Sequence, residues 1–91
     1  MKKEIVNYLL VCGIRPNLKG FRFLYRAIEI TIENNNILPK IYNKVYPTIA
    51  EEFNESASKV ERAIRHSIKT SKENNMTNSE FIAIAALSIN V

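Results

Sequence analysis

Apolar residues recur at helical spacing along most of this chain. In the longest periodic run, residues 19–33, they fall at i, i+3, i+4, i+7 and i+11, which is one face of an amphipathic helix. These residues are Phe21, Leu24, Tyr25, Ile28 and Ile32. The β-branched run 28–32 also suits a strand, but nothing nearby offers it a partner strand. The spacing therefore predicts a helix over 19–33.

Shorter helical segments are predicted on both sides of this run. Apolar spacing favours helices over 4–12, 37–45 and 47–53, and then one from 57 to about 73. A last helix follows the sequence TNSE at 77–80, a capping box in which the Thr caps the helix and the Glu reaches back. No convincing strand pair or hairpin turn appears. The predicted fold class is all-α, a domain of five to six helices.

Residues 47–73 have the sequence form of a helix-turn-helix, two helices joined by a tight turn. Ala50 supplies the small residue where the first helix presses on the second. Asn54 stands where a left-handed backbone is needed, and Ser56 suits the N-cap of the second helix. Glu55 is a departure, because an apolar residue is usual near that point. We predict one domain, 1–91, with a helix-turn-helix over about 47–73.

The second helix of this unit, the recognition helix, has a polar side. Arg can pair bidentately with guanine and Glu can accept from cytosine, while Lys and Ser contact phosphates. The predicted base contacts are Glu61, Arg62 and Arg65. The predicted phosphate contacts are Ser56, Ser58, Lys59, His66 and Lys69. On spacing alone, the alternative is a solvated helix face on which Glu61 and Arg65 form an i,i+4 ion pair.

Composition and charge narrow the possible functions. The 91 residues are 46% hydrophobic, enough for one core, and carry a net charge of +4, which is compatible with a polyanion partner. The single cysteine, Cys12, excludes an internal disulfide and fits a reducing cytosol, so we expect a cytoplasmic protein. No apolar run approaches the roughly 20 residues that span a bilayer. With no catalytic or metal-binding constellation in the sequence, we expect no enzyme activity, no catalytic residues, no metal and no cofactor.

Four stretches of the chain support a family resemblance. They are KGFRFLYRAI (19–28), KVYPTIAEEFN (44–54), SASKVERAIRHSI (56–68) and TNSEFIAIA (77–85). With them the chain resembles the C-terminal DNA-binding effector domain of the sporulation stage-zero master response regulator of endospore-forming Firmicutes. The resemblance implies a six-helix domain that binds promoter boxes in double-stranded DNA, often in tandem as a homodimer, and touches an RNA polymerase sigma subunit. It also implies base reading by the Glu and Arg side chains named above.

Two departures from the family pattern bear on function. Family members carry a receiver domain ahead of this one, so we expect either an excised domain or a stand-alone relative. The connection 70–76 is also shorter than in the family, where the missing piece is implicated in polymerase contact. Occupying the same boxes without recruiting polymerase would make the protein a repressor or competitor. The alternative from another class is a protein-interaction module whose basic face binds an acidic partner. The target sequence and the sign of regulation stay open.

Overall fold

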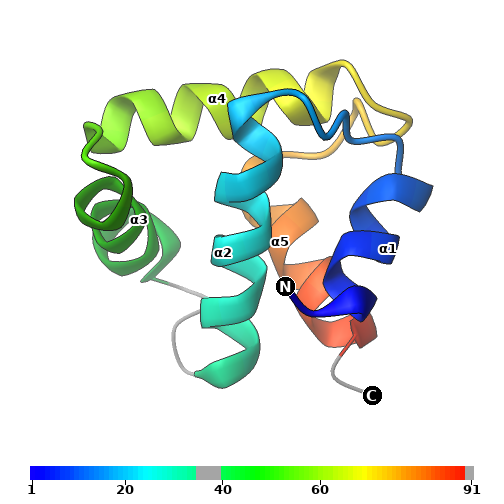
Figure 1. Ribbon diagram of the computed structural model, residues 1–91, viewed down its shortest axis with the longest axis horizontal. Helices are drawn as coiled ribbons and strands as arrows, with labels where there is room; N and C mark the ends of the chain where they lie inside the picture. Colours follow the sequence, from blue (N-terminus) through cyan, green and yellow to red (C-terminus); the bar gives the residue numbers. More distant parts are fainter. Residues whose placement is uncertain (35–39, 90–91) are drawn as a thin grey trace.

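The protein is helical throughout the part of the chain that the structure describes. The computed structural model describes residues 1–34 and 40–89 and contains no strand in these ranges. Its α-helices are α1 (Lys3–Val11), α2 (Lys19–Glu33), α3 (Tyr46–Phe53), α4 (Ala57–Lys69) and α5 (Asn78–Ile89). In Figure 1, α4 lies across one end of the molecule, α2 runs away from it through the middle, and α3 lies on the opposite side from α1 and α5. The predicted all-α class is confirmed.

The core is built around α2, which packs most extensively against α4 and α5. The predicted apolar stripes of α2 and α4 lie inside, and the last helix buries its own stripe against them. Fully buried side chains include Leu24, Ile28, Ile49, Val60, Ile64, Ile68, Phe81 and Ile82. Each such side chain contributes roughly 1.5–3 kcal/mol when it leaves water. This core fixes which side of α4 faces outward.

Two apolar positions are less buried than the periodicity predicts. Ile32 is only partly buried, whereas Thr31 beside it is 2% exposed and donates its hydroxyl hydrogen to the Ala27 carbonyl at 2.8 Å. The reason is that α2 is covered from several sides, so its buried arc is wider than one stripe. Phe53, expected on the apolar side of its helix, is 38% exposed and packs edge-on against Phe23.

The helix predicted over 37–45 needs correction. Residues 35–39 lie outside the described residues. Of the described remainder, Ile41–Val45 is a π-helical segment (η2) that continues into α3 without a break, so it is not a separate α-helix. α3 begins at Tyr46, and Pro47 lies in its first turn, where a missing backbone N–H costs no helical hydrogen bond.

The turn of the helix-turn-helix has the predicted local chemistry. Asn54 adopts a left-handed backbone, with φ 55° and ψ 47°, and the Glu55 amide donates to the Ala50 carbonyl at 2.8 Å. Ser56 caps α4, because its Oγ accepts from the Lys59 amide at 3.2 Å. Both predictions are confirmed. The turn therefore starts α4 at a defined residue and in a defined direction.

The recognition helix is shorter than predicted. It ends at Lys69 rather than near residue 73. Thr70 donates its hydroxyl hydrogen to the His66 carbonyl at 3.1 Å, and Ser71 donates its own to the Ile68 carbonyl at 2.6 Å. The Thr70 and Ser71 backbone amides donate to the same two carbonyls, at 3.1 and 3.0 Å, and the Thr70 hydroxyl also reaches the Ser67 carbonyl at 3.2 Å. The carbonyls of the last turn therefore have donors where the chain leaves the helix. The predicted capping box that opens α5 is confirmed, with reciprocal bonds of 2.9 and 3.1 Å between Thr77 and Glu80.

α2 and α4 lie in close contact at Gly20. A Cβ atom at this position would overlap the Ser67 hydroxyl oxygen and the Ala63 carbonyl oxygen. Ser67 is fully buried, and its hydroxyl has no hydrogen-bond partner among the described residues. The absence of a side chain at Gly20 is therefore what lets the two helix backbones meet.

We expect Gly20→Ala to destabilise the protein by about 1–3 kcal/mol, because the added methyl group forces the helices apart. Helix propensity alone predicts the opposite sign, since Ala in a helix interior is favoured over Gly by up to about 1 kcal/mol. Urea unfolding followed by circular dichroism measures the difference. Arg22→Ala, an exposed change on the same helix, is the control. An unchanged or raised midpoint for Gly20→Ala contradicts the close crossing.

An ion-pair network joins α2 to the first helix of the helix-turn-helix. Arg26 donates from Nε and Nη2 to the two carboxylate oxygens of Glu52, both at 2.8 Å, and from Nη1 to Glu29 at 2.9 Å. The hydrogen bonds from Arg26 lower the pKa of Glu52 below its ordinary value. Because two N–H groups of one guanidinium donate to both oxygens of the Glu52 carboxylate, this contact fixes the position of α3 against α2.

The lowered pKa of Glu52 predicts an acid-dependent loss of stability. A carboxyl group whose folded pKa is depressed contributes stability above its unfolded pKa, about 4.3, and that contribution is lost as the pH falls through the folded pKa. Glu52→Gln should therefore lower the free energy of unfolding at neutral pH, by up to about 1 kcal/mol for a partly exposed pair. Unfolding titrations from pH 7 to pH 3 should show its difference from the wild type shrinking. Glu51→Gln, an exposed neighbour, is the control.

Candidate nucleic-acid interface

The outward side of α4 is a continuous polar face. At 100° per residue, its exposed residues occupy an arc of about 120° on the side opposite the buried Val60 and Ile64. They are Ser58, Lys59, Arg62, Arg65, His66 and Lys69. We call this set the α4 outer face. Because α4 lies along one end of the molecule, no other labelled helix lies beyond it in Figure 1.

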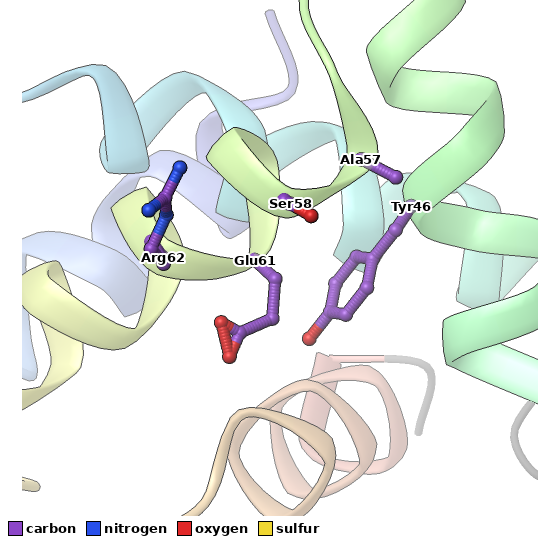
Figure 2. Close-up of a pocket in the computed structure, with 5 residues that line it drawn as sticks. All are labelled: Tyr46, Ala57, Ser58, Glu61 and Arg62. Atoms are coloured by element: carbon purple, nitrogen blue, oxygen red, sulfur yellow. The ribbon is translucent and has the colours of Figure 1, made fainter.

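Most cations on the α4 outer face have no internal partner. Within residues 1–34 and 40–89, the side chains of Lys59, Arg62 and Lys69 make no ion pair or hydrogen bond. Figure 2 shows the Arg62 guanidinium pointing away from the neighbouring Glu61 and Tyr46. These charges are therefore available to an external anion without breaking any contact inside the protein.

Glu61 lies at the edge of this face. Its side chain is only 14% exposed and forms an ion pair with Arg65, with 3.0 Å between Oε1 and Nη1. This is the i,i+4 pair that the sequence offered as an alternative. In Figure 2 its carboxylate points to the same side as the Tyr46 hydroxyl, across a hollow that Ala57 also lines. The pair neutralises the acid and holds the Arg65 side chain, which stays 53% exposed.

Asn78 is a structural contact that the sequence reasoning missed. Its side-chain amide donates to the Glu61 carbonyl and to the Tyr46 hydroxyl, each at 3.1 Å. One side chain at the start of α5 thus ties together α3 and α4 on the flank where Glu61 lies. No local sequence signal indicates this contact, because its partners are 17 and 32 residues away along the chain.

The predicted phosphate contacts fall at several points along α4. Ser56 is exposed at the N-cap, where the partial positive charge of the helix N-terminus favours an anion. Ser58 and Lys59 follow in the first turn. His66 and Lys69 are exposed in the last turn. The structure thus brings Ser58, Lys59, His66 and Lys69 to the same side as Arg62 and Arg65, and places Ser56 at the N-terminal end of α4.

Other kinds of site find no support in the described ranges. Among residues 1–34 and 40–89, no three His, Cys, Asp or Glu side chains gather closely enough to hold a metal ion. In the same ranges, no helix has the length and apolar character that crossing a bilayer requires. Cys12 is partly buried, and burial raises the pKa of its thiol. The α4 outer face is thus the strongest candidate for function.

A family model described as sporulation initiation factor Spo0A C terminal matches residues 5–79. The matched range runs from within α1 to the start of α5, so it contains the whole helix-turn-helix. It includes every predicted contact residue on α4. It ends inside the fourth of the stretches that suggested the resemblance.

Proposed function

The chain belongs to the family of sporulation initiation factor Spo0A C-terminal domains, and on that premise we propose that α4 enters the major groove of a duplex and reads a promoter sequence. The family is a DNA-binding effector domain of a sporulation regulator, so DNA binding and transcription regulation are the function at family level. The observation that supports the residue-level proposal is the α4 outer face, whose cations lie on one arc and are mostly unpaired.

Arg62 and Arg65 are the proposed base readers. A guanidinium can donate two parallel hydrogen bonds to guanine O6 and N7, the commonest specific contact in the major groove. Arg62 is unpaired among the described residues, whereas Arg65 is held by Glu61 at 3.0 Å. This ion pair favours an orienting role for Glu61. Direct base contact by Glu61 stays a prediction.

Phosphate contacts are proposed for the remaining polar residues of this side. Lys59 and Lys69 supply point charges near opposite ends of α4, and Ser56, Ser58 and His66 supply hydrogen-bond donors. Such contacts fix the register of a helix on the duplex without reading sequence. The net charge of +4 adds a general attraction for DNA that salt weakens.

Replacing a base reader and replacing a phosphate contact should have different effects on binding. We expect Arg62→Ala to cost about 1–3 kcal/mol on a selected site and much less on random DNA. Lys69→Ala should weaken binding to all sequences alike and reduce the slope of log K against log salt by about one. Fluorescence anisotropy on both duplexes at several salt concentrations measures each change.

Lys3→Ala, an exposed change on α1, is the control for lost positive charge. Equal losses on selected and random duplexes for Arg62→Ala would refute base reading. If no duplex binds at low salt while an acidic protein partner does, the protein-interaction alternative replaces the proposal.

The Glu61–Arg65 pair predicts a dependence of one substitution on the other. Glu61→Gln should weaken binding to the selected site, because Arg65 loses its orienting partner, and strengthen binding to random DNA, because a negative charge disappears. On an Arg65→Ala background, Glu61→Gln should cause no further loss of specificity. A full additional loss in the double variant would instead support direct base contact by Glu61.

Three finer expectations go beyond what the family match covers. Contact with an RNA polymerase sigma subunit and pairing of two domains on adjacent boxes stay predictions from the resemblance. A cytoplasmic location stays a prediction from the single cysteine and the DNA-binding function. Each can be tested once a bound duplex has been selected.

A further inference from the structure

A cleft of about 400 Å³ runs along one flank of α4. One wall is the edge of the recognition helix, and the other is the connection to α5 with the first turn of that helix. In Figure 1 this connection turns back beneath α4 before α5 begins. The side chains that matter below are Glu61, Arg65, Lys69, Asn74, Asn75 and Ser79.

Several side chains that line the cleft carry hydrogen-bond donors suited to an anion. Its only acid, Glu61, is already paired with Arg65 at 3.0 Å. Asn74, Asn75 and Ser79 are exposed and make no side-chain hydrogen bond within the described residues. Lys69 is likewise unpaired there. Amide and hydroxyl donors therefore line a hollow whose free charge is positive.

The position of the cleft relative to α4 decides which anion it meets. A helix in the major groove, which is about 12 Å wide, has one phosphate backbone on each side. On the α4 wheel, Lys59 and His66 lie about 60–120° from Arg65 and Lys69, toward the flank away from the cleft. Lys59 and His66 thus lie toward one backbone, and the cleft, with Lys69 on its wall, opens beside the other.

We propose that this cleft binds a backbone phosphate of the duplex, with Asn74, Asn75 and Ser79 as donors opposite Lys69. The inference rests on the proposed function, because it takes α4 to be in the groove. It adds a second protein segment, the α4–α5 connection, to the interface. The contact is independent of sequence, since the amides and the hydroxyl meet the phosphate oxygens and not the base edges.

The test compares Asn74→Ala/Asn75→Ala, and separately Ser79→Ala, with the wild type on selected and random duplexes. Each variant should bind both duplexes about 3- to 10-fold more weakly, the loss expected for one or two hydrogen bonds. Asn7→Ala, an exposed change on α1, is the matched control and should bind as the wild type does. Thermal unfolding of each variant checks the fold, and Ser79→Ala serves if the double substitution disturbs the connection.

A phosphate scan locates the contact. In a set of duplexes, single methylphosphonates replace one charged phosphate at a time. Wild-type binding should weaken when a phosphate on either flank of the site is replaced. In the Asn74→Ala/Asn75→Ala variant, replacing phosphates on one flank only should no longer affect binding. In Lys59→Ala, replacing phosphates on the other flank should no longer affect it.

Two outcomes overturn the proposal, and they are distinguishable. If the wild type binds DNA but all cleft variants keep its affinity and its pattern of sensitive phosphates, the cleft contact is refuted and the role of α4 is untouched. If the wild type binds no duplex at low salt, the proposed function fails together with this inference.

Discussion

The close crossing of α2 and α4 at Gly20 is the constraint on which the rest of the structure depends. Because the backbones meet at Ala63 and Ser67, α4 can press its whole inner side onto the core. A helix that buries one side so completely must present the other to solvent. The position of the cationic outer face thus follows from this packing. Gly20, which has no side chain, therefore determines the side on which Arg62 lies.

Both ends of α4 are fixed by short-range hydrogen bonds. The left-handed residue Asn54 reverses the chain, and the Ser56 hydroxyl oxygen accepts from the Lys59 amide in the first turn. At the other end, Thr70 and Ser71 bond back to carbonyls of the last turn. These contacts decide how far α4 extends, and hence how many turns can lie along a groove. The Arg26–Glu52 pair holds α3, the helix before this turn, against α2.

Local signals made much of this fold predictable from the sequence. The bounds of α2, the left-handed Asn54 and the capping box at 77–80 all depend on residues within a few positions of one another. Features set by contacts distant in sequence were not predictable. Gly20 is required because Ala63 and Ser67 of α4 lie against it. The exposure of Phe53 depends on which helices pack over it. The candidate site shows the same difference. The helical spacing of polar residues predicted the outer face of α4, but the cleft beside it depends on where the α4–α5 connection lies in space and was not predicted.

No motif in the sequence marks Asn74 and Asn75, but in space they line the cleft beside α4. The short connection bonds to the end of α1 through the Lys72 amide and the Cys12 carbonyl at 3.1 Å, so it is held beneath α4. A helix in a groove can still roll about its own axis, which would swing Arg62 and Arg65 past the base edges. The proposed phosphate contacts on both flanks would oppose that roll. Neutral donors would do so without steepening the salt dependence of binding, because only charged groups release counterions.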